Sequence, residues 1–496
     1  MSIDSKHPLY TEFYPDWELM SDAYRGERTI KDAGVKYLPP TPGQVIDGME
    51  KEQPGWKNYQ AYKARARFPD FVSQAVEALI GIMHHKPPTI ELPDKLEDLR
   101  EKATVKGESL EMLLRRINEA QLVTGRLGLL ADVKNDAAVG VLPYIALYRT
   151  QDIINWDDGK REEIVLQNLN LVVLNESEYE RQTGFEWNFE TKYRVLVLGD
   201  PLVNEPEGQG IYRMGTYDST KGMAFDEANL IVPSIAGKTL DKLPFIIINS
   251  KDIVADPDDP PLLGLAQLAM AVYRGEADYR QCLFMQGQDT LVVIQGVDET
   301  VRAGAGAVIN VSTGGDAKYI GVDSQGLPEM RMALENDRKE AADIGGQLLD
   351  TRSREAESGD ALKIRVSART ASLNQIAMAG AEGLQTLLRI MAEWVGADPE
   401  KVVVQPNLDF ADDTLEGSTL VQYMQAKVLG APLSKRSIHR LMQEKDITEL
   451  EYEEELAELE KEGADMEGDE GTDAGGNPED DEDENKDEDE ENKDEE

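Results

Sequence analysis

The stretch QLLDTRSREAESGDALKIRVSART, residues 347–370, places a short polar segment between two sequences with helical spacing. The polar segment, TRSREAESGD at 351–360, holds two arginines, three acids, two serines and a glycine, and no large apolar residue. An ordinary helix hairpin needs only a few connecting residues. The interruption therefore predicts a solvated loop with a role of its own, and the surrounding chain decides which role.

Helical spacing continues on both sides of this loop. Residues 327–350 precede it, and residues 361–395 follow it with an apolar stripe that includes Leu373 and Leu384. Further upstream, residues 262–287 predict another helix, about 40 Å long at a rise of ~1.5 Å per residue.

A small β module separates the first two helices in chain order. DTLVVIQG (289–296) and GAVINVS (306–312) combine β-branched residues with glycine-rich turns. The predicted order is therefore helix, β module, helix, polar loop and long helix.

The N-terminal half mixes helices with strands. Residues 1–60, rich in Tyr, Pro and Gly, predict an arm with short elements. Residues 68–84 and 109–124 have helical spacing, and Ser109 is a candidate N-cap. Within 125–250, successive β-branched runs divided by Gly, Asn, Asp and Pro predict a mostly β region. The expected fold class is α+β.

Length and composition limit the class of protein. At 496 residues the chain is too long for one ordinary core, so we expect two or more domains. Cys282 is the single cysteine, which excludes an intrachain disulfide and a cysteine-based zinc site. The sequence opens on no signal-peptide pattern and contains no run of about 18 apolar residues, so we expect a soluble intracellular protein.

The charge is extreme and unevenly distributed. Of the net −44, residues 449–496 contribute −24, from 27 acids and 3 lysines, which leaves −20 for residues 1–448. An acidic body repels phosphates, which disfavours a nonspecific DNA-binding protein and suits one that lets DNA pass without sticking. The low-complexity tail is expected to be disordered. Two roles stay open for it: a solubilising tail, or an electrostatic guard or docking tail for a partner.

Sequence motifs for catalysis are weak. SIAGKTL (234–240) invites a P-loop interpretation through Gly237 and Lys238, but Val232 stands where the motif needs glycine. The sequence that follows also reads as a strand, whereas a phosphate-binding loop needs a helix N-terminus there. We therefore expect no ATPase activity.

Other candidate sites are equally poor. Gly304 and Gly306 form only an isolated GxG, which is more typical of a strand turn. His84 and His85 are adjacent, so on a helix they would point about 100° apart, and no third metal ligand is near. With no GxSxG, HExxH or paired CxxC pattern, the sequence predicts neither an enzyme nor a cofactor or metal site.

The element order resembles that of the portal proteins of tailed bacteriophages, the ring at the capsid vertex through which DNA passes. Local sequence fragments also resemble those of one group of phage portal proteins, a group long filed under a domain of unknown function. The matching fragments are YIALYRTQDIINW (144–156), LPFIIIN (243–249), DPPLLGLAQLAMAVYRGEADYRQ (259–281), LVVIQG (291–296) and SGDALKIR (358–365).

This resemblance covers roughly residues 10–450 and implies a portal-like arrangement of parts. The parts it implies are an N-terminal arm and wing (1–260), a first stem helix (261–287), a clip (288–326), a second stem helix (327–350), a tunnel loop (351–360), a long helix with C-terminal wing and crown (361–448), and an acidic helix with a disordered tail (449–496).

The tunnel loop would project into the channel, which would explain its polarity. Arg352 and Arg354 could contact phosphates, while the neighbouring acids would limit how tightly a ring of such loops holds DNA. Alternatively, these arginines pair with the acids of an ordinary surface hairpin. The candidate channel residues are Arg352, Ser353, Arg354, Glu355, Glu357, Ser358, Gly359 and Asp360.

The resemblance makes the clip a docking surface for the terminase motor during packaging and later for head-completion proteins. Strand pairing between neighbouring subunits would satisfy strand edges in a closed ring. The candidate docking residues are Arg302, Gly304, Gly306, Asp316 and Lys318.

The implied partners follow from this role. They are further copies of the chain in a ring, expected to be a dodecamer; double-stranded DNA bound without sequence specificity; the terminase large subunit; capsid and scaffolding proteins; and head-completion or adaptor proteins. The expected location is the portal vertex of the virion, after assembly in the host cytoplasm. Two rival classes remain: another acidic-tailed capsid or scaffold component without a channel, and an enzyme such as a nuclease or ATPase.

Overall fold

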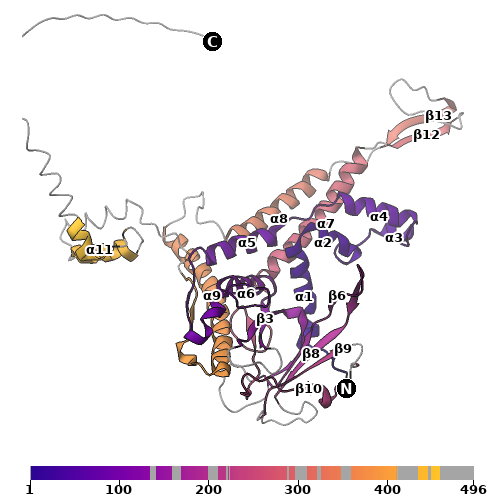
Figure 1. Cartoon of the computed structure of the whole chain (residues 1–496). Coiled ribbons are helices and arrows are strands. Elements are labelled where there is room, and N and C mark those ends of the chain that lie inside the picture. The colour runs from indigo at the N-terminus through magenta and orange to yellow at the C-terminus, as the bar shows by residue number, and fades with distance from the viewer. Residues whose placement is uncertain are drawn as a thin grey trace, which may run out of the picture. The chain divides into compact units, whose positions relative to one another are not determined.

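The structure is a computed structural model of the whole chain (Figure 1). It divides into two compact units, residues 1–410 and 411–496. The residues it describes are 2–133, 141–158, 169–198, 210–218, 222, 224–287, 290–296, 310–320, 326–347, 359–408, 410, 434–444, 448 and 450–458.

Helices and strands mostly fall in separate stretches of the chain, and the α+β class is confirmed. The helices are α1 (Pro8–Arg25), α2 (Glu27–Ala33), α3 (Pro42–Ile46), α4 (Pro54–Arg65), α5 (Phe71–Met83), α6 (Leu110–Thr124), α7 (Leu263–Gln286), α8 (Leu327–Gln347), α9 (Gly359–Val395) and α11 (Lys435–Glu444). The strands are β1 (Thr89–Glu91), β2 (Arg126–Asp132), β3 (Tyr144–Arg149), β4 (Ile153–Asp157), β5 (Leu171–Asn175), β6 (Glu178–Arg181), β7 (Trp187–Glu190), β8 (Lys192–Val197), β9 (Arg213–Asp218), β10 (Leu230–Ile231), β11 (Phe245–Asn249), β12 (Thr290–Gly296), β13 (Val311–Ile320) and β14 (Val403–Gln405).

Residues 1–60 hold α1, α2, α3 and the first part of α4. α1 runs for 18 residues, and Trp17 and Met20 on it are fully buried in the two hydrophobic clusters of the first unit. Pro8 lies in the first turn, where its missing N–H costs nothing, and Pro15 is accommodated inside the helix. Short elements were expected here, and α2 and α3 are short, but the long helix α1 was not predicted because its prolines and aromatic residues obscured its buried helical face.

Strands of the β region form two main sheets. β2 is the central strand of a three-stranded sheet in the order β11-β2-β3, and every residue of β2 is buried. A five-stranded antiparallel sheet has the order β10-β9-β8-β5-β4. Three separate two-stranded pairs complete the described strands: β1 with β14, β6 with β7, and β12 with β13.

The long helix α9 packs closely on this framework through two glycines. A Cβ at Gly383 would overlap Ile248 Cγ1 and Cδ1 on β11, and one at Gly380 would lie 2.7 Å from Asn118 Nδ2 and Gln121 Oε1 on α6. Ile248 is fully buried, so it has little room to move aside. The C-terminal half of α9 is thereby fixed against the sheet.

Replacing Gly383 with alanine should destabilise the first unit by about 1–3 kcal/mol, because overpacking outweighs the gain in helix propensity. The matched control is Gly81→Ala on α5, where an added Cβ meets no atom within 4 Å. That change should be neutral or stabilising by up to about 1 kcal/mol. Urea denaturation of both variants measures the contrast, and equal effects would show that α9 is not closely packed at this point.

His7 is the N-cap of α1, and its capping hydrogen bond requires a neutral imidazole ring. Its Nδ1 accepts a hydrogen bond from the Leu9 N–H at 3.2 Å, and the ring stacks on Trp156 at 4.0 Å. Burial, followed by the nearby positive charge of Arg126, holds the pKa of His7 below its usual 6.5. Protonation at Nδ1 would remove the acceptor and therefore the cap.

Acid should weaken this cap. Because the pKa of His7 is lower in the folded chain than in the unfolded chain, its contribution is complete above pH 6.5 and is lost as the pH falls through the folded value. His7→Asn keeps a capping acceptor without a titrating ring. In urea denaturation, this variant should lose less stability than the parent between neutral and mildly acidic pH, by about 1 kcal/mol or less. The exposed His85→Asn serves as the control, and an unchanged pH dependence in His7→Asn would contradict the assignment.

The second unit contains α11, whose buried side chains include Ile438 and His439. Ser434 Oγ caps it by accepting from the Ser437 N–H at 3.0 Å. His439 packs edge-on against Tyr452, which begins a helical stretch at 452–458. The acidic helix expected at the start of 449–496 is therefore present at 452–458.

Candidate functional site: the helix pair and its hairpin

α7 is fixed in the body by its N-terminal half. It starts after Pro260 and Pro261, and its side chains at Leu265, Ala269 and Tyr273 are buried among α1, α4 and α5. The alanine-rich sequence of this half allows close packing and favours a helix. The C-terminal half then runs on with fewer buried side chains toward the hairpin.

α4 supports α7 beyond its buried half. Tyr62 Oη donates to Asp278 Oδ1 at 2.6 Å, and Arg65 donates to the side chain of Gln281. The Arg65 guanidinium also lies 4.0 Å from the ring centroid of Phe284. α4 therefore holds α7 almost to its last turn.

α8 packs on α7 around a buried carboxylate. Glu276 is 3% exposed and accepts from Arg280 Nε at 2.6 Å and from Arg338 Nη2 at 3.1 Å. At the preceding residue, a Cβ on Gly275 would lie 3.0 Å from Leu334 Cδ2, so the helices approach closely at that point. One acid on α7 is thus paired with an arginine from each helix.

The hairpin β12–β13 connects the C-terminal end of α7 to the start of α8 (Figure 1). Its register pairs Thr290 with Ile320 and Ile294 with Asp316, and then shifts before Gly296 pairs with Val311. Such an irregularity bends and twists a hairpin. Of the predicted β module, β12 lies where the first strand was expected, whereas β13 starts only at Val311, near the end of the second expected strand at 306–312.

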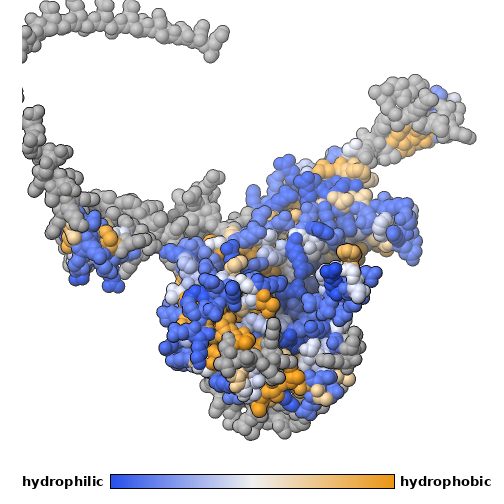
Figure 2. All heavy atoms as spheres, viewed as in Figure 1, coloured by the Kyte–Doolittle hydropathy of each residue, from blue (hydrophilic) through white to orange (hydrophobic). Residues whose placement is uncertain are grey.

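Large apolar side chains are exposed on this unit in the isolated chain. Figure 2 shows hydrophobic residues over the hairpin end of the helix pair and on the hairpin itself. We call this set the apolar band. It consists of Leu283 (41% exposed), Phe284 (39%), Met285 (46%), Ile294 (46%), Val311 (37%) and Met332 (62%). Exposed apolar groups gathered in one part of a molecule mark an interaction surface.

The predicted docking residues are only partly described. Asp316 and Lys318 are exposed on β13, opposite Ile294 and Val292. Two residues apart on one strand, they share a face of the hairpin. Arg302, Gly304 and Gly306 lie outside the described residues.

The predicted tunnel loop is also mostly outside the described residues, including Arg352, Ser353, Arg354, Glu355, Glu357 and Ser358. Its last two members are placed differently from the prediction. α9 begins at Gly359, so Gly359 and Asp360 belong to the first turn of the helix and not to the loop.

Motifs set aside at the sequence level have structural roles. In SIAGKTL, Ala236 and Gly237 form a tight turn with positive φ, and Lys238 Nζ donates to the carbonyl of Glu393 at the end of α9. His84 Nε2 lies 2.9 Å from Asn118 Oδ1, and burial lowers the pKa of His84. Across the described part of the chain, no three potential metal-ligating side chains gather into a site. Among those residues, no helix has the length and apolar character needed to cross a membrane.

Two features of the helix pair escaped the sequence analysis. Glu276 lies four residues after Val272, on the buried face of α7, and an acid at such a position signals a buried ion pair. The apolar band gave a weaker signal, because its members are spread over four elements, α7, β12, β13 and α8. Both features become visible only when α7, β12–β13 and α8 are placed side by side.

Comparison with known protein families finds one match, which includes the helix pair α7 and α8 with the hairpin between them. Residues 261–395 match a family described as "Domain of unknown function (DUF4055)". The match begins two residues before α7 and ends at Val395, the last residue of α9, and it spans well under half of the chain. The matched range therefore covers the hairpin-bearing helix pair and the long helix together.

Solved structures add a weak likeness. Three of them are described as "Neck of native GTA particle computed with C12 symmetry", "Virion of native gene transfer agent (GTA) particle" and "Neck of empty GTA particle computed with C6 symmetry". Each is 13% identical over 75% of this chain and 89% of the other, with a TM-score of 0.36. This likeness is too weak to assign a fold or a role to the chain. No curated protein matches the chain.

Proposed function

We propose that this chain is a structural subunit of the head–tail connecting region of phage-like particles, and more specifically a portal subunit that forms a ring around a DNA channel. The observation that carries the proposal is the apolar band on the hairpin-bearing helix pair. A single copy leaves these side chains exposed to water, whereas neighbouring copies in a ring would cover them.

The charge of the chain supports passage of DNA in preference to tight binding. The body of the protein is acidic in its own right, which repels phosphates at long range. Two arginines among the acids of 351–358 supply limited attraction at one place. We propose that this loop faces the channel and contacts the DNA backbone without reading its sequence.

The hairpin is the proposed docking site for the terminase motor, with Asp316 and Lys318 in the contact. Head-completion proteins would use the same surface after packaging, and capsid and scaffolding proteins would contact the wing. In this proposal the chain is not an enzyme and needs no cofactor, because the motor hydrolyses ATP. It acts at the portal vertex of the virion.

Native mass spectrometry of the purified full chain at rising concentration tests the ring. The proposal predicts one discrete oligomer of many copies, with a dodecamer as the expected mass. A stable dimer, or a broad open-ended series of masses, would count against a closed ring.

A further inference from the structure

A cavity of about 270 Å³ lies between α1, α6 and β3, far along the chain from the hairpin. Three arginines line it, one from each element: Arg25, Arg116 and Arg149. The other charged residue in its wall is Glu119, which accepts a hydrogen bond from Tyr24 Oη at 2.8 Å. In a body with a net charge of −20, this local excess of positive charge is unusual.

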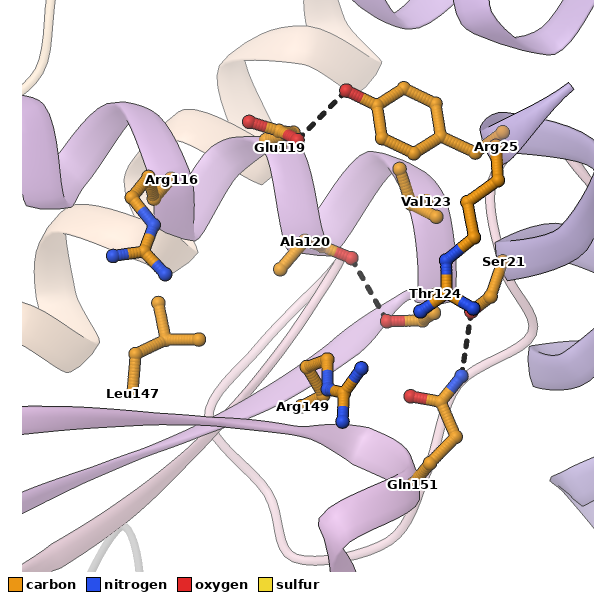
Figure 3. Close-up of a pocket in the computed structure, with 11 residues that line it drawn as sticks. Ser21, Arg25, Arg116, Glu119, Ala120, Val123, Thr124, Leu147, Arg149 and Gln151 are labelled. Atoms are coloured by element: carbon orange, nitrogen blue, oxygen red, sulfur yellow. Dashed lines mark hydrogen bonds between the residues drawn. The ribbon is translucent and has the colours of Figure 1, made fainter. Parts of the chain in front are cut away.

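The arginines have unused donors. Arg149 donates to Asp152 through Nε and Nη2, and Arg116 donates to Glu108 through Nη1. Among the described residues, those bonds leave Arg149 Nη1 and Arg116 Nη2 without an acceptor, and the Arg25 side chain has no ion-pair or hydrogen-bond partner there. Figure 3 shows Arg25 and Arg149 extending toward the same space from opposite walls.

A buried acceptor faces the same cavity. Gln151 is held by its Nε2, which donates to Ser21 Oγ at 2.6 Å and to the Trp17 carbonyl at 3.2 Å. Its Oε1 is buried and, within the described residues, has no hydrogen-bond partner. Such an atom calls for a donor from a ligand. Figure 3 shows this oxygen turned toward the side of the cavity where Arg149 lies.

The floor between these polar groups is apolar, formed by Ala120, Val123 and Leu147. A free inorganic anion gains nothing from such a floor. A peptide uses all three features: a carboxylate for the arginines, a backbone N–H for Gln151 Oε1, and an adjacent apolar side chain for the floor.

We propose that this pocket binds an acidic peptide segment of an assembly partner, in which carboxylates alternate with apolar side chains. One carboxylate lies between Arg25 and Arg149, and a backbone N–H of the peptide donates to Gln151 Oε1. The site is separate from the apolar band, so its failure would leave the ring proposal untouched.

The test uses the full chain and a fluorescently labelled peptide, Glu-Leu-Glu-Leu-Glu, capped at both ends, with binding followed by anisotropy. Arg25→Gln and Arg149→Gln should each weaken binding about tenfold, as expected for loss of one charge-assisted hydrogen bond. Both side chains are exposed, so melting temperatures should not change. The control is Arg28→Gln on α2, whose side chain is 94% exposed and outside the pocket.

Two competitors complete the design. The neutral peptide Gln-Leu-Gln-Leu-Gln should compete at least about tenfold more weakly, and inorganic phosphate should compete hardly at all. Equal competition by the neutral peptide would show that the pocket binds only the apolar side chains, which would contradict recognition of carboxylates. Equal competition by phosphate would show that the arginines bind any anion, which would contradict recognition of a peptide. Absence of binding, or loss of affinity in Arg28→Gln alone, would overturn the proposal.

Discussion

A glutamate at Met332 or at Leu283 is expected to leave the chain folded and to prevent its assembly. Both side chains are exposed in the single chain, so stability should change by only about 0.5 kcal/mol or less. At an interface between copies, an unpaired carboxylate costs several kcal/mol, on the order of 2–5. A closed ring repeats this cost at every interface, so the oligomer should be lost at concentrations where the parent assembles.

Sedimentation velocity of Met332→Glu and Leu283→Glu beside the parent measures this effect. Val105→Glu is the matched control, because Val105 is 74% exposed and lies outside the apolar band. We expect the control to assemble like the parent. Normal assembly of Met332→Glu and Leu283→Glu would show that the apolar band is not an interface between copies.

The second large effect concerns the buried carboxylate between α7 and α8. Arg280→Met or Arg338→Met alone should cost about 1 kcal/mol or less, since Glu276 keeps one partner and both arginines reach solvent. The double variant leaves Glu276, at 3% exposure, without either partner. Its cost should be about 3–5 kcal/mol, far above the sum of the single effects.

A double-mutant cycle in urea denaturation gives the coupling directly. Adding Glu276→Leu to the double variant should restore most of the lost stability, because a buried ion pair can be replaced by apolar groups of similar volume. Additive single effects, or no recovery in the triple variant, would refute the role given to Glu276.

The fold could be predicted from the sequence where one periodic signal dominated. α6 with its Ser109 cap, α7, α9 and the strands of the β region all have clear helical or β-branched patterns, and the structure places them as expected. The helix α1 was not predicted, because Pro15 lies within its sequence and masks the pattern of its buried face. The pair β1 with β14 joins residues more than 300 positions apart, and no local pattern specifies such a contact.

In the candidate site too, the elements with a local pattern could be predicted, whereas the contacts between distant residues could not. The helix–hairpin–helix order was readable because each element has its own pattern. The contacts between those elements could not be predicted, because the ion pair of Glu276 with Arg338 spans 62 positions and the apolar band draws on four elements. The pocket of Arg25, Arg116 and Arg149 is assembled from an unpredicted helix, α1, together with α6 and β3.

The central claim is that copies of this chain close into a ring around a channel. Electron microscopy of the purified full chain, with classification of end-on views, tests it most directly. The account predicts closed rings with an axial hole, and rings that disappear in Met332→Glu. A compact assembly without a hole, or a chain that stays monomeric at every concentration and alongside its capsid protein, would contradict it.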